Sequence, residues 1–147
     1  MKYFQKNKLV IGICIIFIVL CSAFITKIIF KPSITEIVKN NNIELTKIAE
    51  DIINNKSVGE HTFKNVWEIS YHENSNTVEF FCNGSGLDSE TYDEGFYYSP
   101  LNKPLGFQGE NVEFIKYGKG FKYIGVGDNW QYTEKIMDKW YLYKAHF

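Results

Sequence analysis

The segment from Leu9 to Thr26 constrains the fold more than any other part of the sequence, because its eighteen residues carry no charge. A helix rises about 1.5 Å per residue, so this run extended to Phe30 is long enough to cross a hydrocarbon core about 30 Å thick. We therefore expect residues 9–30 to form a transmembrane helix that anchors the chain in the lipid bilayer.

The charges beside this run predict its orientation. Three lysines precede it within residues 1–8, and no acidic residue occurs before residue 33. By the positive-inside rule, the N-terminus is expected in the cytoplasm and the C-terminal domain outside the cell membrane. Lys27 and Lys31 on the other flank weaken this bias.

A cleaved signal peptide is the alternative interpretation of the same N-terminus. It combines the basic residues 1–8, an apolar stretch over residues 9–20 and a small-residue exit at Cys21-Ser22-Ala23. The apolar run continues to Phe30, further than a signal peptide requires. This length favours a retained, single-pass signal anchor.

The remainder of the chain, about 115 residues, has the length of one domain. Residues 33–147 hold eleven lysines, no arginine and seventeen acidic residues, a net charge of −6. Phosphate backbones demand clustered positive charge, so nucleic acid is not expected as a partner. Cys82 is the only cysteine after the anchor, so we expect a buried core thiol and no disulfide within the domain.

The hydrophobic period after the anchor is that of a helix. Within residues 33–55, apolar residues gather on one side of a helix and charged residues on the other. Ser33 and Glu36 have the spacing of a capping box, and the asparagines at 40–42 are weak helix formers. We expect one amphipathic helix whose apolar stripe packs on a sheet. The residues expected in this contact are Ile37, Val38, Leu45, Ile48 and Ile52 of the helix, and Trp67, Ile69 and Phe80 of the sheet.

Residues 64–147 change to the period of two that is typical of strands. The short loops favour antiparallel neighbours. The predicted fold is therefore α+β: a transmembrane helix, then a long amphipathic helix packed on an antiparallel β-meander of five or six strands. Residues 83–111 are the least regular stretch and offer at most one more short strand within 92–99. The strands are expected near residues 67–71, 77–82, 112–117, 121–126, 130–132 and 140–145.

No catalytic constellation stands out in this domain. The glycines near residues 118–120 and 125–127 suit tight hairpin turns, because a phosphate-binding loop would open a helix. The three histidines lie in separate elements, and the acidic run lacks the spacing of a calcium-binding EF-hand loop. We expect no catalytic residue, no cofactor and no metal site. The residues weighed here are His61, His72 and His146, and Asp88, Glu90, Asp93 and Glu94.

Aromatic residues are unusually dense toward the C-terminus. In the last predicted strand, Trp140 points to one face, and Tyr141 and Tyr143 point to the other. One helix covers one face, so the exposed face is either a stabilising ladder or a recognition surface for a saccharide or protein partner. The candidate binding residues are Tyr97, Tyr98, Asp128, Asn129, Trp130, Tyr132, Glu134, Tyr141 and Tyr143.

Two C-terminal blocks carry a resemblance. Residues 95–100, and residues 127–136 followed by 140–143, resemble blocks of small, uncharacterised membrane-anchored proteins of Gram-positive bacteria. That resemblance implies no activity.

We expect a membrane-anchored, extracytoplasmic binding or accessory module without enzymatic activity. One alternative is a small cell-envelope hydrolase with paired carboxylates, in which Asp93 or Glu94 acts with Asp128 or Glu134. The other is a pilin-like assembly subunit, since such proteins also run from an anchor into a helix and a sheet.

The uncharged run makes a direct prediction about topology. Alkaline carbonate extraction should leave the chain in the membrane pellet, and protease added to intact spheroplasts should degrade the C-terminal domain. Release into the medium of a chain that begins after Ala23 would show instead that the N-terminal segment is a cleaved signal peptide.

Overall fold

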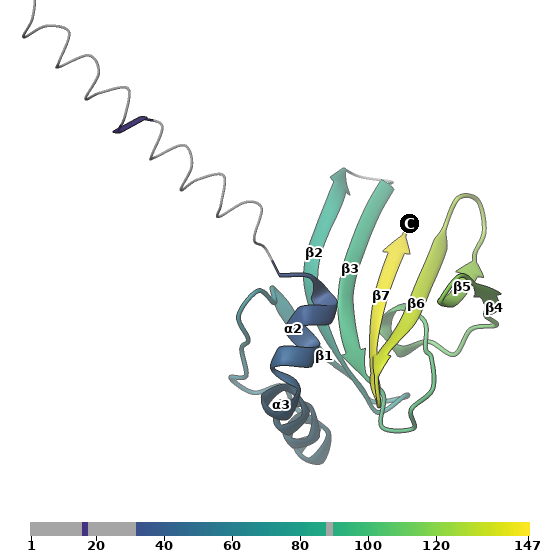
Figure 1. Ribbon diagram of the computed structural model, residues 1–147. Coiled ribbons are helices and arrows are strands. Elements are labelled where there is room, and N and C mark those ends of the chain that lie inside the picture. The colour runs from purple at the N-terminus through teal and green to yellow at the C-terminus, as the bar shows by residue number, and fades with distance from the viewer. Residues whose placement is uncertain (1–15, 18–31, 88–89) are drawn as a thin grey trace, which may run out of the picture. The chain divides into compact units, whose positions relative to one another are not determined.

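The computed structural model describes residues 16–17, 32–87 and 90–147 (Figure 1). Residues 34–147 form one compact unit of helices and strands. Its elements are α2 (Ile34–Asn40), α3 (Asn42–Asn55), β1 (Glu68–His72), β2 (Thr77–Leu87), β3 (Glu90–Tyr98), η1 (Phe107–Gly109), β4 (Ile115–Tyr117), β5 (Gly120–Ile124), β6 (Trp130–Met137) and β7 (Trp140–His146).

The transmembrane helix expected over residues 9–30 falls almost wholly outside the described residues and stays a prediction. Of that segment, the structure describes only Ile16 and Phe17, which are helical. Among the described residues, no helix has the length and apolar character that a membrane crossing requires.

All seven strands of the described chain belong to one antiparallel sheet with the order β1-β2-β3-β7-β6-β5-β4. Two meanders, β1 to β3 and β4 to β7, meet where β3 pairs with β7. The α+β class and the antiparallel sheet are confirmed. The single meander of five or six strands is wrong, because the last strand returns to the centre of the sheet, where both of its aromatic faces are buried.

The expectation of an irregular stretch over residues 83–111 is wrong in its first part. There β2 continues to Leu87 and β3 starts at Glu90, so the two strands form a long hairpin. The hairpin is rich in polar residues and glycines, so its sequence lacks the hydrophobic alternation that predicts strands. A register shift between Phe81 and Asn83 also interrupts the alternation. The irregular part is the connection over residues 99–114, which we call the crossover loop.

The expected helix over residues 33–55 is divided into α2 and α3 at Asn41. The side-chain amide of Asn41 donates to the Ile37 carbonyl at 2.7 Å, and the backbone N–H of Asn41 approaches the same oxygen at 3.2 Å. Such local side-chain bonds compete with the regular helical ladder. The break lets α2 pack against β6 and β7 while α3 packs against β2.

The expected core between helices and sheet is largely confirmed. At its centre, Phe80 stacks on Phe96 with ring centroids 4.8 Å apart, and Cys82 is buried beside them. Trp67 is the exception, because it precedes the edge strand β1, meets Phe81 edge-on and stays 65% exposed. Ile37, Val38, Leu45, Ile52 and Phe80 are buried as expected, while Ile48 and Ile69 are partly buried against the same core.

Replacing Leu45 tests this packing. Leu45→Ala should lower the free energy of unfolding by about 2–5 kcal/mol, because it leaves a cavity in a fully buried contact. Ile43→Ala is the matched control, since Ile43 is 85% exposed, and should change the same quantity by less than about 0.5 kcal/mol. Urea denaturation followed by circular dichroism measures both. Equally small losses would show that α3 does not pack on the sheet.

Candidate functional site

Four of the predicted binding residues are buried in the core and do not form a surface. The prediction of an exposed ladder at Tyr141 and Tyr143 is wrong. The sequence argument assumed that the face opposite the helices stays open, whereas the crossover loop covers it with Leu105 and Phe107. The four buried residues are Tyr97, Tyr98, Tyr141 and Tyr143, each 2% exposed.

Three of these tyrosines, Tyr97, Tyr141 and Tyr143, face the crossover loop and hold it in place through their hydroxyl groups. The fourth, Tyr98, lies in the core beneath the helices, and its hydroxyl donates to Glu50 at 3.1 Å. The hydroxyl of Tyr97 accepts the N–H of Leu105 at 2.9 Å and lies 3.1 Å from the Leu105 carbonyl. The Tyr141 hydroxyl donates to the carbonyl of Asn102 at 2.8 Å. From β6, Gln131 Oε1 accepts the N–H of Phe107 at 2.8 Å. The aromatic density of this face therefore serves the attachment of a loop.

A buried carboxylate completes this attachment. Glu79 is 7% exposed and accepts the Tyr143 hydroxyl at 2.9 Å and the Gln108 N–H at 3.0 Å. His72 Nε2 lies 3.3 Å from the same carboxylate. Burial, and then the charge of Glu79, raise the pKa of Tyr143 well above its usual range, so this hydroxyl keeps its proton and remains a donor.

Sequence reasoning missed Glu79. The sequence feature that could have indicated it is a charged residue between Val78 and Phe80 in an otherwise hydrophobic strand. Burial, and then the charge of Glu79, also raise the pKa of Asp93, which lies on the same sheet face.

The acidic run does not form a paired site. Asp93 and Glu94 are consecutive in β3, so their side chains point to opposite faces of the sheet. Glu94 shares the helix-facing side with Glu134, so the alternative of a hydrolase that pairs these two carboxylates stays a prediction. Among the described residues, no group of three metal-ligating side chains is present.

A different group of side chains meets on the helix-facing side of the sheet. In Figure 1 the upper parts of β2, β3, β7 and β6 extend beyond α2 and α3. There the strand register aligns side chains in two parallel rows across five strands. The aromatic row consists of Ser85, Tyr92, His146, Trp130 and Ile124, and the polar row consists of Asn83, Glu94, Lys144, Tyr132 and Lys122.

Neighbouring side chains hold Trp130, which lies next to the central His146 of the aromatic row, in a fixed orientation. Its ring is parallel to that of His146, with centroids 6.0 Å apart and an interplanar angle of 4°. Tyr92 approaches from the side, with ring centroids 6.1 Å apart, and Lys122 Nζ lies 5.0 Å from the Trp130 ring centroid. The tryptophan is half-buried, so part of its surface stays accessible in a preset position.

The polar row is equally well ordered. Glu94 lies 3.7 Å from Lys144 Nζ and 3.4 Å from the side-chain amide of Asn83. The hydroxyl of Tyr132 donates to Glu134 at 2.6 Å. Burial, and then this bond to a carboxylate, raise the pKa of Tyr132 to about 12.

The predicted binding residues are thus only partly brought together. Trp130, Tyr132 and Glu134 share the surface of the two rows, and Asn129 and the exposed Asp128 lie in the turn that leads into β6. The sequence missed the members contributed by β2, β3, β5 and β7. The two-residue spacing of Lys144 and His146 indicates that both lie on one face of a strand. The residues beside them on β3 are known only from the pairing of β3 with β7.

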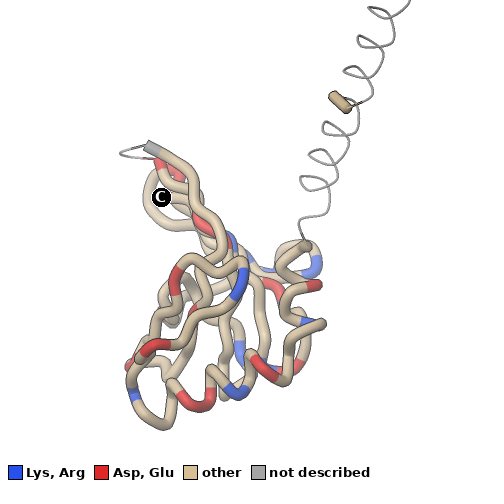
Figure 2. Tube along the Cα trace, turned by 90° about the vertical axis from the view of Figure 1, so that its left-hand side faces the viewer, with Lys and Arg blue, Asp and Glu red and all other residues tan. Residues whose placement is uncertain are grey.

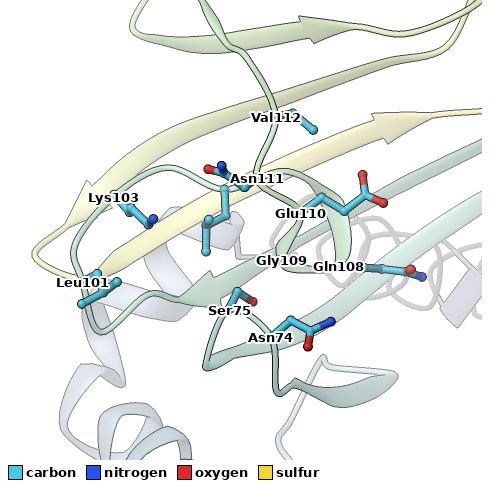
Figure 3. Close-up of a pocket in the computed structure, with 10 residues that line it drawn as sticks. Asn74, Ser75, Leu101, Lys103, Gln108, Gly109, Glu110, Asn111 and Val112 are labelled. Atoms are coloured by element: carbon cyan, nitrogen blue, oxygen red, sulfur yellow. The ribbon is translucent and has the colours of Figure 1, made fainter.

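A hollow of about 590 Å³ lies on the other side of the sheet, between the β1–β2 turn and the crossover loop (Figure 3). Figure 3 shows Lys103 and Glu110 on opposite sides of it, with Ser75 and Asn74 between them. Leu101 at its margin is 72% exposed. The hollow is an open depression whose lining is about equally polar and apolar.

No protein-family model, curated protein or solved structure matches this chain. The resemblance of residues 95–100 and 127–143 to small membrane-anchored proteins therefore stays a prediction.

The hydroxyl of Tyr143 offers a test of the loop attachment. Tyr143→Phe should lower the free energy of unfolding by about 1–3 kcal/mol, because it leaves the buried carboxylate of Glu79 without one of its donors. Tyr117→Phe is the control, since Tyr117 is 57% exposed, and should stay within about 0.5 kcal/mol of wild type. Chemical denaturation measures both. Equal stability of the two variants would contradict the role assigned to Tyr143.

Proposed function

We propose that this chain is a membrane-anchored, non-enzymatic binding module and that its ligand lies across the aromatic and polar rows. The predicted anchor over residues 9–30 would keep the N-terminus in the cytoplasm and display the domain on the outer side of the cell membrane. The proposal rests on one observation: ordered aromatic and ionisable side chains lie together where the helices no longer cover the sheet.

The contrast along this one sheet face supports the proposal. Under the helices, Phe80, Phe96 and Trp140 are at most 1% exposed and form a packed core. Beyond the helices, Trp130 is half-buried and Ile124 is 61% exposed, although both continue the same face. Aromatic side chains with polar neighbours are typical of binding surfaces, since they offer large contact area at little cost in conformational entropy.

The two lysines of the polar row allow a test that does not require the ligand to be known. Amine acylation of Lys122 and Lys144 should be several-fold slower in intact cell envelopes than in the purified full-length protein, because a bound ligand covers them. Lys56 serves as the internal control, since its side chain is 67% exposed and belongs to neither row. Mass spectrometry of the acylated chain reports all three rates.

Two variants connect this protection to the rows. Trp130→Ala should abolish the protection of Lys144 in envelopes, whereas Trp67→Ala removes an exposed tryptophan from outside the rows and should leave it unchanged. Equal acylation of Lys122 and Lys144 in envelopes and in purified protein would overturn the proposed function.

A further inference from the structure

We infer that the ligand of the two rows is a linear, uncharged saccharide chain, an inference that rests on the proposed binding function. The reasons are the place of the rows in the sheet, the pairing of an aromatic with a polar row, and the balance of charge across them.

The place of the rows disfavours an extended peptide. Peptides commonly add to the edge of a sheet, where backbone N–H and C=O groups are unpaired. The rows are centred on β3, β7 and β6, which are interior strands with a hydrogen-bonded neighbour on each side. A ligand on this face of the sheet can contact only side chains. It can use both rows if its apolar faces meet the aromatic row and its polar groups, at its edges, meet the polar row.

A sugar ring has this distribution of polar groups, with C–H bonds on its faces and hydroxyls around its perimeter. The aromatic row offers Tyr92, and the part of Trp130 that His146 and Lys122 leave accessible, to the C–H faces. The polar row offers carboxylate, ammonium and amide groups to the hydroxyls. The rows are two residues apart along each strand, about 7 Å. Across five strands they extend for about 19 Å, which suits several sugar units in a line.

The charges of this surface favour an uncharged chain. Lys122 and Lys144 are balanced by Glu94 of the polar row and by Glu134 beside it. Lys144 and Glu94 are paired, and Lys122 lies over the rings of Trp130 and Tyr117, at 5.0 and 5.4 Å from their centroids. Figure 2 shows acidic and basic positions interspersed along the folded unit. Within the rows, a polyanion or polycation would therefore meet no continuous patch of opposite charge.

Titration of the full-length protein in lipid nanodiscs tests this inference. The probes are hexasaccharides of chitin and of cellulose, and isothermal calorimetry is the readout. At least one hexasaccharide should bind, and it should bind more tightly than the disaccharide of the same sugar, because a longer chain contacts more residues of the rows. Trp130→Ala should weaken this binding at least tenfold, and Trp130→Phe should restore most of it. Trp67→Ala should bind as wild type, and circular dichroism checks that each variant is folded.

The outcomes separate failure of the saccharide inference from failure of the proposed function. If neither hexasaccharide binds, or if Trp130→Ala binds as wild type, the saccharide inference is overturned, and the proposed function then depends on the lysine protection alone. Enzymatic treatment of the cell envelopes distinguishes a saccharide ligand from a protein ligand. Protection of Lys122 and Lys144 that is lost after a glycan hydrolase supports a saccharide, whereas protection that persists after the hydrolase overturns it in favour of a protein partner.

Discussion

The pairing of β3 with β7 holds the domain together, because it joins two meanders that would otherwise be separate small sheets. Phe96 lies opposite Leu142 and Tyr97 lies opposite Tyr141 in this pairing. Consecutive residues face opposite sides, so the same two strands supply side chains to both cores of the domain. The pairing also aligns Tyr92 with His146, and thereby builds the aromatic row.

The two faces of the sheet are covered by different physical means. On one face α2 and α3 bury an apolar stripe, and the mainly hydrophobic contact includes hydrogen bonds from Tyr98 to Glu50 and from Trp140 to Thr46. On the other, the crossover loop, which contains the short 3-10 helix η1, brings backbone polar groups to a buried surface, where each needs a hydrogen-bond partner. Tyr97, Tyr141, Gln131 and Glu79 provide these partners. This need explains why polar aromatic residues gather where a purely apolar core might have been expected.

The placement of the helices decides which part of the sheet remains accessible. The short α2 and the longer α3 cover only part of one face, so the strands continue beyond them with both aromatic and charged residues. The crossover loop occupies the centre of the opposite face through Leu105 and Phe107. An accessible and ordered surface thus arises because the covering elements on the helix side are shorter than the strands they cover.

The sequence by itself determined the elements whose signals are local. Apolar residues such as Leu45 and Ile52 recur at helical spacing, and strands such as β1 and β7 alternate, so both kinds of element could be predicted from periodicity. The burial of Cys82 followed in the same way. The candidate residues Trp130, Tyr132 and Glu134 were also identified from sequence, because aromatic and polar residues lie close together in that stretch.

Only the tertiary structure decided what covers each face and which strands are neighbours. Tyr141 and Tyr143 have the same sequence pattern whether they are exposed or lie beneath a loop, and the crossover loop that buries them has no periodic signal. The two rows combine residues separated by up to about sixty positions, from Asn83 to His146. Strand pairing over such distances is fixed by the packing of the whole sheet and leaves no local trace in the sequence.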